Sequence, residues 1–399
     1  MMPAKRILIL TNRVPYPLND GGNMAMDAMI QGYRMQEWEV YLLSMNTTRH
    51  LVSQEKLDGL YRNIYKFETV DVNNDVTPFQ VIKNMLFSNE PNHAHRFYHI
   101  SFRNKLKTIL YDFGPDVVHV ESVFLSSYIP FIKEQGAFAV LRMHNIEWQV
   151  WQRLADETKS IKSWYLNNLA KRIKSYEEKA WNDYNLLLPI TEHDASVAKI
   201  ATNTETHVVP FGITPKHAYV VPENWVGYHI GAMDWLPNKE AVDWFINDVW
   251  PLVHQIIPDF QFYFAGRNMP ASYLSQNVDG ITCASEVPDA DAFIADKKIL
   301  IVPLRSGGGI RVKILEAMAV AKVVISTSVG AQGIDAIDGV HYLKADTPDA
   351  FVKQILWVLQ HKNEVERIAQ NAKELVKAKY DANQIAVDLS QKLLTKVKK

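Results

Sequence analysis

Residues 298–334 read KILIVPLRSGGGIRVKILEAMAVAKVVISTSVGAQGI, and this stretch decides the fold. The apolar, β-branched runs at 299–304 and 323–327 predict two buried strands. Between them, three glycines allow a sharp turn, and apolar residues at helical spacing from Ile310 to Met318 predict a helix. This order of elements is typical of a parallel sheet. The glycines would then lie at the carboxyl end of a strand, where open α/β sheets bind ligands.

The residues after the glycines indicate which ligand that corner prefers. Arg311 and Lys313 are expected in the first helical turn, where two cations oppose the helix dipole unless an anion lies beside them. A bound phosphate or pyrophosphate would explain both. Glu316 would repel that anion, so it is better suited to a neutral partner such as a sugar diol. The alternative is an ordinary glycine-rich turn with surface charges.

Residues 303–327, PLRSGGGIRVKILEAMAVAKVVIST, resemble the nucleotide-binding segment of the retaining glycosyltransferases of family four, which have the GT-B fold. The resemblance implies an α/β protein of two Rossmann-like domains whose parallel sheets face each other across a cleft. The second domain would hold a nucleotide sugar and the first an acceptor. Many members carry two glutamates eight positions apart. Here the second matches Glu316, but Gly308 occupies the first position, so backbone N–H groups of the glycine loop are expected to substitute.

A second departure from the family pattern lies in the loop after strand 226–230. Many members have an arginine there that grips pyrophosphate, whereas this chain has Ala232 and Met233. We therefore expect Arg311 and Lys313 to bind the pyrophosphate in place of that arginine.

Length and composition fit two domains and exclude several classes of protein. The chain has 399 residues, with a predicted acceptor domain at 1–207, a nucleotide-sugar domain at 208–380, and a terminal helix at 381–399 that crosses back to the first domain. A net charge of −1 gives no reason to expect nucleic-acid binding. The single cysteine, Cys283, excludes an intramolecular disulfide and a cysteine-based zinc site. We expect no cofactor and no metal requirement.

No apolar run approaches the length of a spanning helix, so we expect a cytoplasmic protein, either free or at the inner face of the membrane. The basic amphipathic helix predicted at 159–181 could lie on anionic lipid, but a solvated helix face is favoured because Glu177, Glu178 and Asp183 dilute its charge. A short strand and a Pro/Gly turn at 207–213 are expected to mark the passage between the domains.

The first domain is predicted to begin with a βαβ unit. A strand at 6–10 is followed by a loop at 11–22, a helix to residue 36 and a strand at 39–44. The loop segment PYPLNDGGN, which includes Gly21 and Gly22, resembles the glycine loop that lies beside the donor phosphates and acceptor in the family. Without that resemblance, the two glycines would indicate only a turn.

Polar residues also follow two predicted strands of this domain. Glu121 follows the strand at 116–120, and His144, Asn145 and Glu147 follow the strand at 138–142. The carboxyl ends of parallel strands are placed for function, although a single histidine is often structural. In the family, a histidine of the corresponding loop lies close to the transferred sugar, and His144 matches it.

In the second domain, Arg267 follows a strand at 260–265, and Val287 follows one at 281–286 in the segment that holds the nucleotide base in the family. The predicted catalytic residues are His144 and Glu316. The predicted donor-binding residues are Gly21, Gly22, Arg267, Val287, Gly307, Gly308, Gly309, Ile310, Arg311, Lys313 and Glu316.

We therefore expect a retaining glycosyltransferase, of the hexosyltransferase type, that moves a sugar from a nucleotide-diphosphate sugar to a glycan, a lipid-linked acceptor or a polysaccharide. Two alternatives stay open: a sugar-nucleotide epimerase of the same architecture, and a non-catalytic nucleotide-sugar-binding protein. A dinucleotide oxidoreductase is disfavoured because no GxGxxG follows the first strand.

Overall fold

The structure is a computed structural model that describes residues 5–18, 20–77, 84, 88, 90–158, 162–214, 224–275, 277–307 and 309–397. The chain divides into two compact units, Met1–Gly212 with Ala382–Lys399, and Ile213–Asp381. Within the described part of the chain, no helix combines the length and the apolar character needed to span a bilayer.

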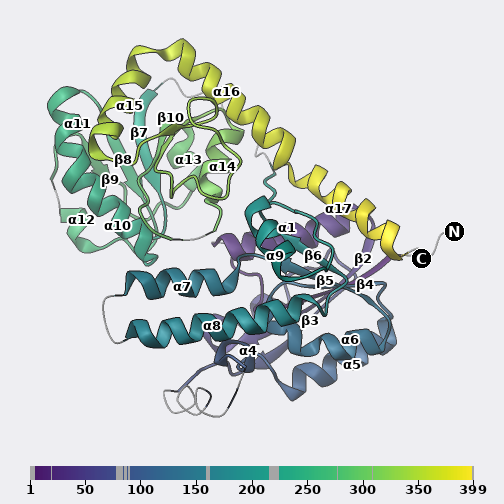
Figure 1. Cartoon of the computed structure of the whole chain (residues 1–399). Coiled ribbons are helices and arrows are strands. Elements are labelled where there is room, and N and C mark those ends of the chain that lie inside the picture. Colours follow the sequence, from purple (N-terminus) through teal and green to yellow (C-terminus); the bar gives the residue numbers. More distant parts are fainter. Residues whose placement is uncertain are drawn as a thin grey trace. The chain divides into compact units, whose positions relative to one another are not determined.

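The elements of the first unit alternate between strands and helices (Figure 1). In chain order they are β1 (Lys5–Thr11), α1 (Gly21–Met35), β2 (Trp38–Thr47), η1 (Thr48–His50), α2 (Gln54–Leu57), β3 (Lys66–Val72), α4 (Asn92–His95), α5 (Ile100–Phe113), β4 (Val117–Val120), η2 (Val123–Tyr128), α6 (Ile129–Glu134), β5 (Phe138–Met143), α7 (Glu147–Glu157), α8 (Lys162–Trp181), β6 (Leu186–Pro189), α9 (Glu192–Ala201) and, from the end of the chain, α17 (Ala382–Val397).

The second unit repeats this alternation. Its elements are β7 (Asn224–Ile230), α10 (Leu236–Trp244), η3 (Phe245–Val249, a π-helical turn), α11 (Trp250–Ile256), β8 (Phe262–Ala265), α12 (Ala271–Ser275), β9 (Ile281–Cys283), α13 (Ala290–Ala295), β10 (Lys297–Val302), α14 (Val312–Ala319), β11 (Val323–Ser326), β12 (Leu343–Lys344), α15 (Pro348–Gln360) and α16 (Lys362–Lys379).

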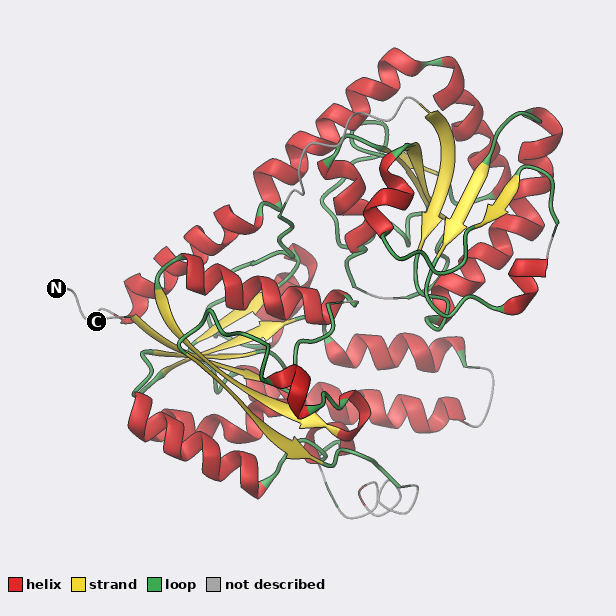
Figure 2. Cartoon of the chain, turned by 180° about the vertical axis from the view of Figure 1, so that it is seen from behind, coloured by secondary structure: helices red, strands yellow, loops and turns green. Residues whose placement is uncertain are grey.

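The two sheets have the same topology. The strand order is β3-β2-β1-β4-β5-β6 in the first unit. Read from the equivalent edge, the order in the second unit is β9-β8-β7-β10-β11-β12, and all pairs are parallel. Helices cover the faces of the strands in each unit (Figure 2). The predicted α/β fold with two Rossmann-like sheets is confirmed. In both sheets the strand order reverses between two central strands, β1 and β4 or β7 and β10, and ligands of such sheets bind at the carboxyl side of this point.

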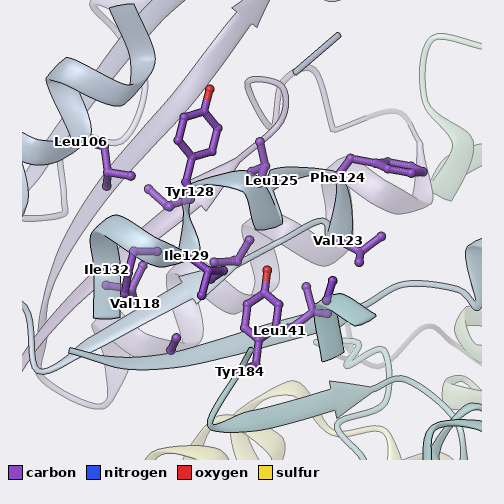
Figure 3. Close-up of a cluster of buried hydrophobic side chains, with 14 of the residues drawn as sticks. Leu106, Val118, Val123, Phe124, Leu125, Tyr128, Ile129, Ile132, Leu141 and Tyr184 are labelled. Carbon is purple, nitrogen blue, oxygen red and sulfur yellow. The ribbon is translucent and has the colours of Figure 1, made fainter. Parts of the chain in front are cut away.

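The period-two pattern of the strands fills a core on each face of the first sheet. Leu8 and Leu10 of β1 belong to the core that contains α5 and α6, part of which Figure 3 shows around Tyr128. Ile7 and Ile9 of the same strand belong to the core that contains α1 and α17. A strand buried on both faces reads as one continuous apolar run, which is why the sequence reveals it.

Helix α17 packs on the first sheet's helix α1. A Cβ added at Gly32 would lie 3.0 Å from the Cβ of Ala386, so the helices approach closely there. The Trp38 indole Nε1 donates to Ser390 Oγ at 2.8 Å in the buried contact. Glu205 pairs with Lys392 and Lys396 at the rim.

Two predicted elements differ in the structure. Residues 207–213 form no strand; two backbone bonds reach β6, His207 N–H to Leu187 O and Val209 N–H to Pro189 O, both 2.9 Å. The ladder of backbone hydrogen bonds stops there because Pro189 and Pro210 have no N–H to donate.

The helix predicted from residue 310 begins at Val312 instead. Arg311 has φ −86° and ψ 92°, so its backbone is extended and it lies before the first turn.

Candidate active site

The point of strand reversal in the second sheet is built from two loops and one helix. The loop after β7 leads into α10, and the glycine loop after β10 leads into α14. Lys313 of α14 connects them, because its Nζ lies 3.1 Å from Oδ1 of Asn238 on α10. Asn238 in turn donates from Nδ2 to the carbonyl of Ala232 at 2.9 Å, which fixes the first loop. Lys313 is therefore held at the edge where ligands of α/β sheets bind.

The second partner of Lys313 is a buried histidine on β7. His229 lies with Nδ1 2.8 Å from the carbonyl oxygen of Ile301 on β10. A carbonyl only accepts, so Nδ1 carries the proton and Nε2, 3.4 Å from Lys313 Nζ, is left as an acceptor. Burial lowers the pKa of His229 well below its usual range, and the Lys313 charge lowers it further. Both contacts of Lys313 are therefore neutral groups.

The electrostatics of this corner favour an anion. Burial lowers the pKa of Lys313 to about 7, and the nearby charge of Arg311 acts in the same direction. The Arg311 guanidinium, on a residue only 5% exposed, lies over the ring of Trp235 at 5.3 Å and donates to the carbonyl of Gly309. The charges of Lys313 and Arg311 repel each other, so an anion bound beside them would be stabilised by both.

The start of α14 adds to this preference. Arg311 occupies the N-cap position but has no acceptor atom in its side chain, so it cannot cap the first N–H groups of the helix as serine or aspartate would. Glu316, one turn into the helix, lies near Lys313 and Tyr228, because its charge acts to raise the pKa of both. The start of α14 thus offers an anion two cations and the first N–H groups of the helix, and Glu316 lies one turn further along the helix.

Glycines bring the loops of this corner into contact. Gly231, at the end of β7, would meet Asn238 Nδ2 at 2.5 Å and Lys313 Nζ at 2.8 Å if it carried a Cβ. A Cβ on Gly266, at the end of β8, would lie 1.8 Å from the carbonyl oxygen of Gly231. Gly307 has φ +102° and lies against Trp235, and Gly309 has φ +80°, so the loop after β10 adopts the left-handed conformations that glycine permits.

The other predicted donor residues are distributed around this edge. Arg267 follows β8 and lies 3.7 Å from Asp234, which also accepts from Asn268 Nδ2 at 2.9 Å. Val287, half-buried, lies in the loop after β9, and Ile310, half-buried, precedes Arg311. Gly308 lies outside the described residues.

In the first unit, the predicted histidine belongs to a buried chain of polar groups. His144 Nε2 lies 2.7 Å from Glu121 Oε2, and His119 Nε2 lies 3.0 Å from Glu121 Oε1, at ion-pair distance but without hydrogen-bond alignment. Tyr33 of α1 continues the chain, with its hydroxyl 2.8 Å from His119 Nδ1. The His144 side chain is 23% exposed and the Glu121 side chain is fully buried. This series of polar side chains thus begins with Tyr33 in the core and ends with His144 at the surface.

Charge fixes the state of Glu121. Burial alone would raise the pKa of this carboxyl, but His119 and His144 outweigh it and hold the pKa well below its usual range. The carboxylate only accepts, so His144 donates from Nε2, and Nδ1 is the acceptor of its neutral ring. The backbone N–H of Glu121 donates to Leu10 O at 3.0 Å, which places the carboxylate beside the end of β1, at the strand reversal.

A buried arginine lies near the same carboxylate. Arg142 of β5 is 1% exposed and donates to the carbonyls of Val209 and Pro210. Burial lowers its pKa, while the charge of Glu121 acts to raise it. These carbonyl bonds hold the segment after β6 against the sheet without a regular strand.

The first glycine loop is stabilised by its own charges. Asp20 caps α1 by accepting from the N–H of Asn23 at 3.0 Å, and it accepts from Arg13 at 2.8 Å. A Cβ on Gly22 would meet that arginine at 2.6 Å, and Gly21, at the start of α1, is exposed. The loop is therefore pinned at the carboxyl end of β1.

Sequence reasoning missed Tyr33, His119 and His229. Contacts across 72 to 86 residues leave no local pattern. The one available signal was a histidine inside each of two apolar strands, DVVHV and VGYHI. Across the described residues, no group of three or more His, Cys, Asp or Glu side chains is arranged to hold a metal ion.

Residues 226–361 match the family described as glycosyl transferases group 1. The match lies within the second unit. It includes His229, Asn238, Arg311, Lys313 and Glu316, which we call the Lys313 corner. A curated relative, the uncharacterized 44.6 kDa protein in the cps region of Klebsiella pneumoniae, is 22% identical over 398 residues, covering 95% of this chain and 97% of the relative.

Solved structures share the whole architecture at low identity. HepE of Anabaena in complex with UDP has a TM-score of 0.68 at 13% identity, covering 98% of this chain and 100% of HepE. Sucrose-phosphate synthase of Thermosynechococcus elongatus also has a TM-score of 0.68, at 14% identity, with coverages of 97% and 98%. A glycosyltransferase of Rickettsia africae has a TM-score of 0.63 at 14% identity, with coverages of 100% and 99%.

These likenesses show that the chain has the GT-B fold. The resemblance inferred from residues 303–327 is confirmed at the level of the group 1 glycosyl transferases, whose family model matches residues 226–361.

Proposed function

We propose that this protein transfers a sugar from a nucleoside diphosphate sugar to a hydroxyl group of a glycan, a lipid-linked acceptor or a polysaccharide, with retention of configuration. The observation that carries the proposal is the Lys313 corner, where Lys313 is held by two neutral side chains next to the charge of Arg311, at the strand reversal of the domain that matches the family. Structures of similar fold bound to UDP and to UDP-glucose support a donor of this kind.

The corner would act on the leaving group. As the bond between the sugar and the phosphate breaks, negative charge grows on the diphosphate. Lys313, Arg311 and the N–H groups at the start of α14 would stabilise that charge, an effect typically worth several kcal/mol of activation free energy. We infer that these groups replace a divalent ion, so donor binding is expected to persist in EDTA. Glu316 lies near Lys313 and would offer its oxygens to sugar hydroxyls.

The first unit would supply the acceptor side and His144. With Nε2 bound to Glu121, the His144 ring is fixed in one tautomer and orientation. The His144 ring is partly exposed and can contact a substrate, whereas Glu121 and His119 are buried and can only position it. Retention of configuration rests on the family resemblance.

A ligand screen followed by product analysis tests the proposal. UDP, GDP, ADP and CMP and their common sugar conjugates are added with EDTA, and thermal unfolding is monitored. A ligand at 100 times its Kd stabilises by roughly 2.7 kcal/mol, which raises the melting temperature measurably. Proton NMR of the reaction with candidate acceptors then gives the anomeric configuration of the product. Conversion of the donor sugar without any acceptor would favour the epimerase instead, and binding without turnover would favour a binding protein.

Gly231→Ala is expected to weaken nucleoside diphosphate binding about tenfold, a cost of roughly 1.4 kcal/mol. The added Cβ would displace Asn238 and Lys313, two flexible side chains, so the unit should still fold. Isothermal titration with UDP, or with the nucleotide that the screen selects, measures the change. Gly339→Ala is the control: it has φ +72° and no atom within 4 Å of the added Cβ, so it should lower stability without changing affinity. Equal affinities in the two variants would place the phosphates elsewhere.

A further inference from the structure

A second group of basic side chains lies at the carboxyl edge of the first sheet, apart from the chain that ends in His144. We name Arg49, His50, His93 and Arg96 the cationic cluster. Arg49 and His50 lie in η1, directly after β2, while His93 lies in α4 and Arg96 directly follows it. None of these residues stood out in the sequence, because they come from two short helical turns more than forty residues apart.

Their charges act on one another, which places them close together. The charges of Arg49 and Arg96 both lower the pKa of His93, after burial, which is the larger cause and takes that pKa to about 4. Burial is also the largest cause that lowers the pKa of His50. The charges of Arg13, Arg49 and Arg96 lower it further, and Asp20 acts to raise it. Burial and then Arg49 lower the pKa of Arg96. The cluster thus holds two guanidinium groups and two imidazoles.

The cluster also has polar atoms that no protein group satisfies. Arg96 Nε and His93 Nδ1 are buried, and within the described residues they have no hydrogen-bond partner. The walls beside them are aromatic: the guanidinium carbon of Arg96 lies 4.8 Å from the ring of Phe97, and the His93 ring lies 4.5 Å from that of Trp151. A buried N–H without an acceptor is costly, and an anion would remove that cost.

Among the described residues, three carboxylates lie near the cluster, and none of them neutralises it fully. Asp75 lies 3.6 Å from Arg49 with both side chains more than half exposed, so this pair is weak. The charge of Asp20 acts to raise the pKa of His50, but this carboxylate is already paired with Arg13 at 2.8 Å. Glu147, the first residue of α7, lies near Arg96, but burial raises its pKa to about 7, so near neutral pH it carries only part of its charge.

We propose that the cationic cluster binds an anionic group of the acceptor, a carboxylate or a phosphate, and so selects an acidic sugar or a phosphorylated chain. The inference rests on the proposed function, in which the first unit receives the acceptor. Glu147 lies near Arg96 and follows His144 by three residues, so the anion would bind at the same sheet edge as His144. Arginine's planar fork suits both oxyanions. The half-buried, aromatic-walled setting of Arg96 and His93 fits a discrete group better than a flat lipid surface.

Histidine ring signals report on this site directly. The full chain, with ¹³C-labelled histidine rings, is titrated with inorganic phosphate, with D-glucuronate and with uncharged D-glucose. His93→Gln and His50→Gln assign two of the 13 histidines. We expect phosphate or glucuronate, but not glucose, to shift both signals and to raise both pKa values, because a bound anion stabilises the imidazolium forms. The stronger of the two anions tells a phosphorylated acceptor from an acidic sugar.

Variants test the arginines. Arg96→Gln is expected to weaken the better anion at least tenfold, and Arg49→Gln, at an exposed residue, gives a second variant that should fold. Arg62→Gln is the control, since Arg62 is exposed and, within the described residues, donates only to the carbonyl of Asp58. The proposal is overturned if neither anion moves the His93 and His50 signals, if the arginine variants bind as the control does, or if saturating UDP displaces the anion. Loss of UDP binding or turnover alone would instead refute the proposed function.

Discussion

Replacing Glu121 by alanine is expected to lower the free energy of unfolding of the first unit by about 3–5 kcal/mol, the usual cost of removing one partner from a buried charged network. The carboxylate is fully buried and lies between His119 and His144, with the buried Arg142 charge nearby. Without it, that guanidinium would stay in the core with no opposite charge. Urea denaturation followed by tryptophan fluorescence measures the change. Glu39→Ala is the control, because Glu39 pairs with Arg6 at the surface and should cost less than about 1 kcal/mol.

Glu121→Gln separates positioning from stability, because the amide keeps the size of the side chain but can donate as well as accept. We expect this variant to lower turnover roughly 100-fold, at the low end of what a positioned histidine contributes. His144→Ala should lower turnover by at least as much. In both variants the loss of turnover should exceed any loss of donor affinity, because the donor phosphates are proposed to bind at Lys313 in the second unit. Turnover of Glu121→Gln equal to that of the unchanged protein would mean that His144 works without its carboxylate.

The sheets could be predicted from the sequence because strands buried on both faces are short apolar runs. The runs at 6–10, 116–120, 138–142, 299–304 and 323–327 all correspond to strands. Strand β3 was missed. It is at the edge of its sheet, and its sequence, KFETVDV, is half-exposed over most of its length. Partial burial leaves no continuous apolar run, so such a strand resembles a loop in sequence.

The candidate site was predictable only where one local segment carries it. Arg311 and Lys313 stand beside three glycines in sequence, so their role could be inferred. Their partners could not, because Asn238 and His229 lie 75 and 84 residues from Lys313. The helix start was misplaced by two residues for a similar reason. Arg311 is extended because it lies over Trp235 and donates to Gly309, contacts that no helix propensity encodes.

Lys313→Met is expected to weaken UDP binding 10- to 100-fold, since charge-assisted hydrogen bonds are worth roughly 1.5–3 kcal/mol. Lys313→Met should also abolish the proton uptake that we expect to accompany UDP binding at pH 8. Without ligand, the pKa of Lys313 is about 7, so at pH 8 most of this side chain is neutral. A diphosphate beside it raises the pKa, so binding at pH 8 draws a proton from the buffer, and affinity should fall as the pH rises above 7.

Calorimetric titrations in HEPES and in Tris measure that uptake, because the two buffers release protons with different enthalpies. Lys322→Met is the matched control. Burial lowers the pKa of Lys322 to about 8. However, Lys322 directly precedes β11, so it lies at the amino end of the strands, away from the Lys313 corner, and it donates to the carbonyls of Ile294 and Lys297. It should leave the proton uptake unchanged. In the ligand-free protein, a lysine with a lowered pKa makes stability rise from pH 7 towards 10.5, because the unfolded chain then holds more protons, and Lys313→Met should flatten that rise. If uptake persists in Lys313→Met, another group must meet the diphosphate.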